Sequence, residues 1–301
     1  MQLSSRMALL WLIALSRVFA GGSDVHAKLK EEQTRVPVKV VDIHGKEVSQ
    51  EIVVTVLYDD AAPKPYPVLV LNHGRSAKAS GRVAVGRARF SAASAWLAGF
   101  GFMVAVPTRV GYGVTGGEDV ENSGACNRKN YPPVYLAAAA QTLKVLDVLR
   151  GRADVAKDRA VVMGQSFGGT TAITVASLNP AGVQAAINFA GGGGGNPETR
   201  PQDPCSQSAL QRLFGNYGKT ARIPTLWVYT ENDMYFGPKL PREWFAAFKA
   251  SGGAGEYILF PANGDNGHLL FTRAPDVWQP RVLEFLRPLG YQPFEAKGAR
   301  K

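Results

Sequence analysis

The hydrophobic pattern predicts a mixed sheet that begins with an antiparallel pair. Apolar and polar residues alternate over 34–43 and again over 51–59, which is typical of strands with one face in water. The turn formers of residues 44–47 join the two runs. The next two runs, 65–74 and 102–107, are almost wholly apolar, as expected of strands that are covered on both faces.

Helical patterns alternate with apolar runs along the rest of the chain. Helices are predicted over 86–101 and 133–151, and the second ends at a glycine. Further strands are predicted at 159–164, 183–190, 225–230 and 255–260, with helices after Phe167 and over 241–252 and 275–290. This order predicts an α/β fold, a mostly parallel central sheet with antiparallel N-terminal strands and helices on both faces.

Two glycine-rich segments, 109–133 and 191–224, interrupt this alternation. Long irregular segments are usually functional surface loops, so we expect both to lie near the site. Each contains one of the chain's two cysteines, Cys126 and Cys205, among turn formers. A disulfide between them is expected from this context and from the predicted export, and the alternative is two free thiols.

The first twenty residues resemble a secretory signal peptide. Arg6 precedes nine apolar residues, Met7–Leu15, and a small residue follows at Ala20. Nine residues are too few to span a bilayer, which takes about 20. The alternative is a buried N-terminal helix. We expect cleavage after Ala20, export to the periplasm or the medium, and a single domain over 21–301 without stable membrane insertion.

Charge adds little to this picture. The formal net charge is +10, and +8 remains without residues 1–20. The basic residues are scattered, and no zinc-ligand spacing, basic helix or aromatic RNA-binding signature is present. Nucleic acid is therefore not an expected partner, and the oligomeric state is not indicated.

The segment Gly164-Gln165-Ser166-Phe167-Gly168 indicates chemistry. It matches the G-x-S-x-G nucleophile elbow, in which a serine stands on a sharp turn between a strand and a helix. Flanking glycines allow the strand and the helix to approach without Cβ clashes. The alternative is a glycine-rich helix start that has no chemical role.

A nucleophilic serine needs a base, and the base needs an orienting acid. The expected chain order is serine, acid, histidine, and His268 is the only histidine after Ser166. Asp233, just beyond a predicted strand, is the expected acid. Glu231 and Asp265 are its competitors, and Asp265 is too close to His268 in sequence to be the usual partner.

Other residues are candidates for the oxyanion hole and the substrate pocket. The backbone N–H groups of Arg75 and Phe167 are the expected oxyanion donors, since one donor comes from the loop after the strand ending near residue 72. His73 precedes the serine and is interpreted as structural. Tyr112, Tyr235 and Phe236 are candidate pocket residues, although each could equally be packing.

Two further features have open interpretations. The glycine run 191–195 is either part of the pocket lining or, less well supported, a phosphate cradle. Arg75 and Arg109 could bind an acidic substrate group, but a structural ion pair is the preferred interpretation for Arg109.

Together the motifs NHGRS, GQSFGG, LWVYTENDMYF and GDNGH resemble the α/β-hydrolase superfamily and, within it, the exported dienelactone-hydrolase-like group. The resemblance covers about 36–289 and implies hydrolysis through an acyl-enzyme, with a small-molecule ester as substrate and no metal or organic cofactor. The enzymes that gave the group its name use a cysteine nucleophile, and the serine here favours an ester over dienelactone.

Two alternatives to an esterase remain at this point. One is a serine peptidase of the prolyl-oligopeptidase type, although those carry a large extra domain. The other is a non-catalytic hydrolase-like binding protein, against which the complete set of serine, acid and histidine argues.

Overall fold

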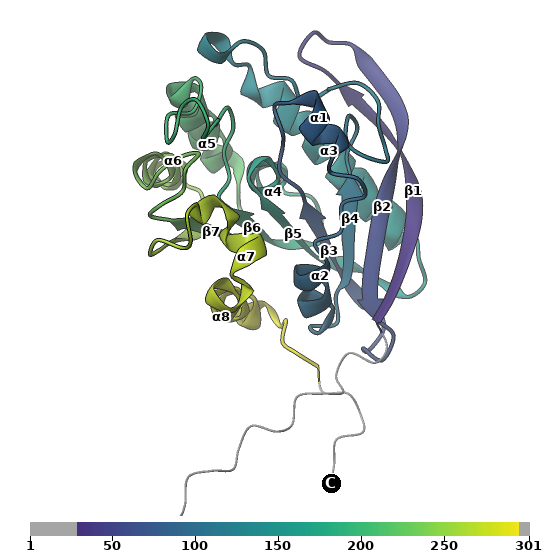
Figure 1. Ribbon diagram of the computed structural model, residues 1–301. Coiled ribbons are helices and arrows are strands. Elements are labelled where there is room, and N and C mark those ends of the chain that lie inside the picture. Colours follow the sequence, from purple (N-terminus) through teal and green to yellow (C-terminus); the bar gives the residue numbers. More distant parts are fainter. Residues whose placement is uncertain (1–28, 295–301) are drawn as a thin grey trace, which may run out of the picture.

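An eight-stranded sheet forms the centre of the protein in the computed structural model, which describes residues 29–294 (Figure 1). The strand order is β1-β2-β4-β3-β5-β6-β7-β8. The first two pairings, β1 with β2 and β2 with β4, are antiparallel, and all later ones are parallel. The strands are β1 Leu29–Val41, β2 Glu47–Asp59, β3 Tyr66–Asn72, β4 Met103–Thr108, β5 Val155–Gln165, β6 Val183–Phe189, β7 Thr225–Thr230 and β8 Gly255–Phe260.

Helices cover both faces of this sheet. They are α1 Ala79–Val83, α2 Ser91–Ala98, α3 Tyr131–Arg150, α4 Phe167–Leu178, α5 Gln207–Thr220, α6 Lys239–Ala250, α7 Leu270–Arg273 and α8 Pro275–Leu286. Alternate residues of β3 face opposite layers: Val68 and Val70 pack with residues of α3 and α4, and Leu69 and Leu71 with residues of α2 and α8. The predicted α/β fold with an antiparallel start is therefore confirmed.

The second irregular segment contains a helix that the sequence analysis did not predict. Gly215 and Gly218 obscured the pattern of α5, because glycine is unfavourable inside a helix. Leu210, Leu213, Phe214 and Tyr217 are nevertheless buried at helical spacing. Gly218 is needed because α5 passes close to α6: a Cβ on Gly218 would lie 2.1 Å from the carbonyl oxygen of Phe248.

The predicted signal peptide, residues 1–20, lies outside the described residues. Between residues 29 and 294, no helix has the length and apolar character that crossing a membrane requires.

Candidate active site

Ser166 lies at a sharp turn between β5 and α4. Its backbone has φ +57° and ψ −123°, a conformation that costs a non-glycine residue on the order of 1–3 kcal/mol. The flanking glycines make the turn possible. A Cβ on Gly164 would lie 2.2 Å from the carbonyl oxygen of Gly168, and one on Gly168 would lie 2.2 Å from that of Asn72. The expected strand–turn–helix context is present.

His268 and Asp233 form a buried pair at the same end of the sheet. The distance from His268 Nδ1 to Asp233 Oδ2 is 2.9 Å, and the exposed fractions of the side chains are 4% and 0%. Asp233 lies in the turn after β7, where its Oδ1 accepts hydrogen bonds from the backbone N–H groups of Tyr235 and Phe236 at 2.7 and 3.1 Å. The carboxylate is thus fixed on both oxygens and holds the imidazole through Nδ1.

The competing acids lie elsewhere. Glu231 and Asp265 are exposed, and neither forms an ion pair with His268. Asp265 precedes the histidine by only three residues in the sequence. Of the three candidate acids, the structure brings only Asp233 to the histidine.

Two asparagines connect the loops that carry this pair. Asn266 Oδ1 accepts hydrogen bonds from the backbone N–H groups of His268 and Met234, both at 3.1 Å. Asn232 donates from its side chain to the carbonyl of Gly264 at 2.8 Å. The sequence analysis missed these residues, although Asn266 precedes a glycine, and asparagine next to glycine signals a turn in which the side chain bonds the backbone.

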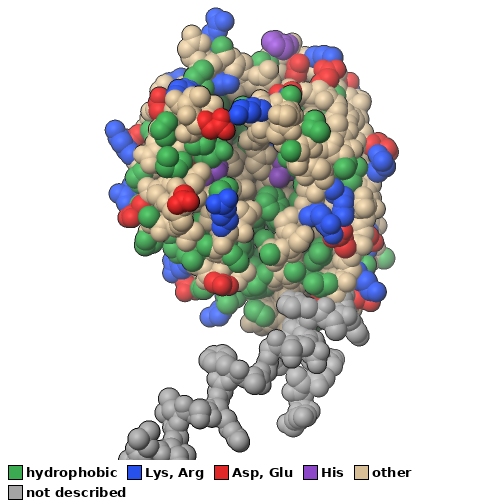
Figure 2. Space-filling model, in the orientation of Figure 1, with side chains coloured by type: hydrophobic (Ala, Val, Ile, Leu, Met, Phe, Trp, Pro, Cys, Tyr) green, Lys and Arg blue, Asp and Glu red, His purple; other side chains and the backbone are tan. Residues whose placement is uncertain are grey.

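Ser166 and His268 line one cavity of about 500 Å³, the His268 cavity, together with Tyr235 and apolar residues such as Phe90. No direct hydrogen bond joins the serine to the histidine. Figure 2 shows this face of the molecule hollowed near its centre, with histidine side chains at the walls. The imidazole packs on the Tyr235 ring with centroids 4.0 Å apart.

The loop after β3 runs directly beside Ser166. A Cβ on Gly74 would lie 3.2 Å from the Cβ of Ser166 and 3.8 Å from its Oγ. Phe167 is the first residue of α4, so no carbonyl of its own helix accepts its N–H. Arg75 follows Gly74, and its backbone N–H makes no hydrogen bond to a described residue. Both expected oxyanion donors therefore lie next to the nucleophile with free N–H groups.

A buried ion pair contacts the loop after β3. Arg109 Nε lies 2.5 Å from Glu121 Oε1, and both side chains are fully buried. Arg109 also donates to the carbonyl of His73 at 2.8 Å. The preferred interpretation of Arg109 as a structural ion-pair residue is confirmed, and the interpretation of His73 as structural agrees with this contact.

The pKa of His73 lies well below its ordinary value because the ring is buried and lies beside the positive charge of Arg109. The neutral ring accepts the N–H of Arg109 at Nε2, 3.3 Å away, and Nδ1 donates to the carbonyl of Gly74 at 2.7 Å. The imidazole therefore holds the loop that carries Gly74 and does not serve as a second base.

The expectation that Tyr112 lines the pocket was wrong. Tyr112 is fully buried, and its hydroxyl donates to Glu121 Oε2 at 2.6 Å and accepts from Arg75 at 3.3 Å. A tyrosine between glycines resembles an exposed loop residue in sequence, but here the acid twelve residues after Arg109 supplies a buried partner for the hydroxyl.

A second cavity of about 360 Å³ also borders Ser166. It is called here the glycine-walled cavity, because Gly192–Gly195 line it together with Tyr235 and Phe236. Tyr235 and Phe236 thus line a cavity at Ser166, and their contact with substrate stays a prediction. A Cβ on Gly192 would lie 2.5 Å from the Phe236 ring. The glycine run allows this backbone to pass close to aromatic side chains, which favours pocket lining over a phosphate cradle.

The sequence model of the dienelactone hydrolase family matches residues 57–253, which is most of the chain. The chain belongs to the dienelactone hydrolase family. Membership supports hydrolase activity, and the matched span contains Ser166 and Asp233 but ends before His268. No curated protein sequence matches this family member significantly.

Solved structures share the fold of this family member at low sequence identity. An acetyl xylan esterase from Paenibacillus sp. R4 is 17% identical with a TM-score of 0.57, over 88% of this chain and 89% of that one. An esterase from Pyrococcus furiosus is 15% identical with a TM-score of 0.54, over 85% and 90%. An acylaminoacyl peptidase from Pyrococcus horikoshii is 12% identical with a TM-score of 0.58, over 90% of this chain but 43% of that one.

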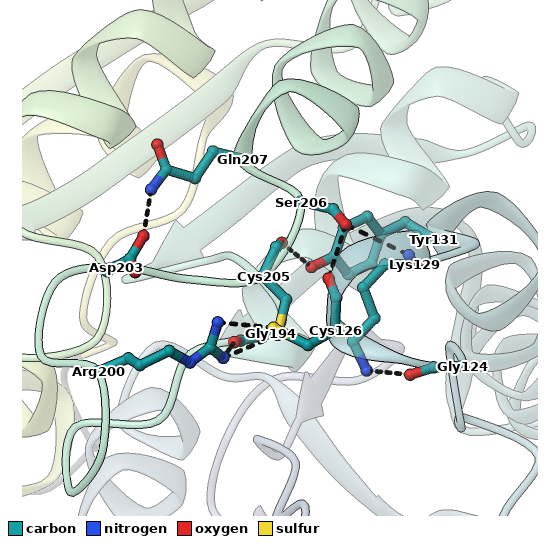
Figure 3. Close-up of a disulfide and its surroundings, with 10 residues drawn as sticks. All are labelled: Gly124, Cys126, Lys129, Tyr131, Gly194, Arg200, Asp203, Cys205, Ser206 and Gln207. Carbon is teal, nitrogen blue, oxygen red and sulfur yellow. Dashed lines mark hydrogen bonds between the residues drawn. A yellow bond between two sulfur atoms is a disulfide. The ribbon is translucent and has the colours of Figure 1, made fainter.

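A disulfide joins the two irregular segments of this hydrolase, as expected from the sequence (Figure 3). The linked residues, Cys126 and Cys205, are also tied by the Ser206 hydroxyl, which donates to the carbonyl of Cys126 at 2.8 Å. Tyr131 donates to the carbonyl of Cys205 at 2.6 Å, and Gly194 accepts the N–H of Cys205 at 3.0 Å. The disulfide is thus hydrogen-bonded to two residues that line the glycine-walled cavity, Tyr131 and Gly194.

Proposed function

We propose that this member of the dienelactone hydrolase family is an exported serine hydrolase that cleaves carboxylic esters through an acyl-serine intermediate. The observation that supports this most strongly is the strained Ser166 at the β5–α4 turn. It borders the same cavity as His268, whose imidazole pairs with the buried Asp233. Export rests on the signal-peptide pattern of residues 1–20 alone.

In the proposed reaction His268 Nε2 takes the proton of Ser166 as Oγ attacks the ester carbonyl. Asp233 keeps the proton on Nδ1 and stabilises the imidazolium that forms. The N–H groups of Arg75 and Phe167 donate to the oxyanion. His268 then protonates the departing alkoxide, and water cleaves the acyl-serine by the same steps.

A peptidase of the prolyl-oligopeptidase type is less well supported. The two esterases that share this fold are matched over 90% and 89% of their own length, whereas the acylaminoacyl peptidase is matched over only 43% of its length. A binding protein without activity would have no need for a strained serine beside a buried acid–histidine pair.

We expect the purified protein of residues 21–301 to hydrolyse phenyl hexanoate over many turnovers and to leave the matched anilide intact. The physical reason is that the nitrogen of an anilide is a poorer leaving group than the oxygen of a phenyl ester. Release of phenol and of aniline, followed under identical conditions, checks this. Faster cleavage of the anilide would favour the peptidase, and release of neither product would favour a binding protein.

A further inference from the structure

Both cavities border Ser166, but different catalytic groups line them. The His268 cavity contains the histidine, and the glycine-walled cavity contains Phe167, whose N–H is a proposed oxyanion donor. Ser166, Arg75 and Tyr235 border both. An ester bound at Ser166 therefore has two different places for its two halves.

The proposed chemistry assigns each half to one cavity. The departing oxygen must come within hydrogen-bond reach of the imidazole that protonates it. His268 lines only the His268 cavity, so the alcohol half of the ester lies there. The acyl half is attached to the carbonyl carbon on the opposite side and extends into the glycine-walled cavity.

The glycine-walled cavity has an excess of positive charge. Three cations line it, Arg75, Arg82 and Lys129, but only one carboxylate, Asp119. Asp119 is occupied by Arg75, at 2.6 and 2.8 Å, and by Arg82, at 3.3 Å. Lys129 Nζ donates to the carbonyl of Gly124 at 2.5 Å, and no carboxylate among residues 29–294 forms an ion pair with it.

An anion beside Lys129 would offset the cost of burying its ammonium group near other cations. Its ammonium is partly buried, and this burial, together with the charges of Arg75 and Arg200, lowers its pKa. An ammonium has three donors, of which the structure uses one. The backbone around it is fixed, because the Lys129 N–H bonds the hydroxyl of Ser206, next to the disulfide, at 3.3 Å.

Three arginines line the His268 cavity, but each of them already has a carboxylate partner. Arg75 pairs with Asp119, and Arg87 and Arg89 share Glu31 at 2.8 and 2.6 Å. Apolar side chains, among them Val85 and Phe90, make up much of the remaining wall. This side suits an uncharged alcohol.

We propose that the preferred substrates are monoesters of dicarboxylic acids, with the free carboxylate of the acyl group paired to Lys129 and an uncharged alcohol in the His268 cavity. The inference rests on the proposed function. In the reaction, the bond from Ser166 Oγ to the carbonyl carbon forms and the bond to the alcohol oxygen breaks. The alcohol leaves with the proton carried by His268, and water releases the dicarboxylate.

Three matched esters test the inference: the phenyl monoester of adipic acid, neutral phenyl hexanoate, and carboxyphenyl hexanoate, which has its carboxylate on the alcohol. We expect kcat/KM for the adipate ester to exceed that for phenyl hexanoate by about tenfold, the size of one charge-assisted contact. No such gain is expected for carboxyphenyl hexanoate. The preference should fall as salt is added.

Variants of Lys129 test whether the charge of this side chain causes the preference for the adipate ester. Lys129→Gln should abolish the preference for the adipate ester over phenyl hexanoate, mainly through KM for the adipate ester. Lys129→Arg should keep most of the preference. Lys144→Gln, which removes the same charge from the exposed surface of α3, is the matched control.

Equal rates on the adipate ester and phenyl hexanoate, or a preference that survives Lys129→Gln, would overturn the inference but leave ester hydrolysis intact. A preference for carboxyphenyl hexanoate would reverse the assignment of the cavities and overturn it too. If wild type cleaved none of the three, the proposed function itself would fail, and the inference with it.

Discussion

Replacement of Ser166 by alanine should reduce the turnover of phenyl hexanoate by a factor on the order of 10⁴ or more. The reason is that the covalent route needs the serine oxygen, whereas the oxyanion donors alone retain only a small rate. The fold should be unaffected, and the strain of the turn remains because alanine has the same backbone preference as serine there. Steady-state kinetics and circular dichroism of the purified variant check both parts.

The losses in turnover from replacing the serine and the histidine should be non-additive, because both residues take part in the same proton transfer. His268→Ala should cost about as much as Ser166→Ala, and the double variant hardly more than either. Asp233→Asn should cost somewhat less, because the imidazole loses its orientation but remains present. Glu231→Gln is the matched control, since it removes an exposed acid two residues from Asp233. Losses that multiply in the double variant would contradict a shared mechanism.

Loss of the Cys126–Cys205 disulfide should lower the free energy of unfolding by up to roughly 4 kcal/mol, the chain-entropy value for a closed loop of this length. Denaturation with and without a reductant measures the loss. Hydrolysis of phenyl hexanoate below the new melting range should be retained, because neither cysteine touches Ser166, Asp233 or His268.

The double variant Cys126→Ser/Cys205→Ser controls for side effects of the reductant. It should match the reduced protein in stability and show no further response to the reductant. Alkylation of both cysteines in the native, unreduced protein, or a stability that the reductant does not change, would contradict the disulfide.

The elbow could be predicted from the sequence because its constraints are local. The glycines at 164 and 168 are dictated by contacts within the turn and with the end of β3. Asp233 could be ranked first because it lies a few residues beyond the end of β7, where a turn can direct it to the histidine. In each case, the order of strand, turn and helix along the chain determines where the side chain goes.

The features that could not be predicted depend on contacts between residues that are distant in the sequence. The burial of Tyr112 depends on Glu121 and Arg75, which meet only in the folded loop. The α5 helix depends on packing against α6, which overrides its two glycines. Lys129 looked like one of many scattered cations, and only the geometry shows that the nearby carboxylate, Asp119, is already paired with arginines.

Covalent labelling with an organophosphonate tests the central claim most directly, because it reports the activated nucleophile independently of any chosen substrate. We expect one equivalent to attach to the peptide that contains Ser166, with loss of ester hydrolysis in proportion. The label should be absent from Ser166→Ala and slow to attach in His268→Ala. A protein that hydrolyses phenyl hexanoate but carries the label at another residue, or remains unlabelled and fully active, would contradict the assignment of Ser166 as nucleophile.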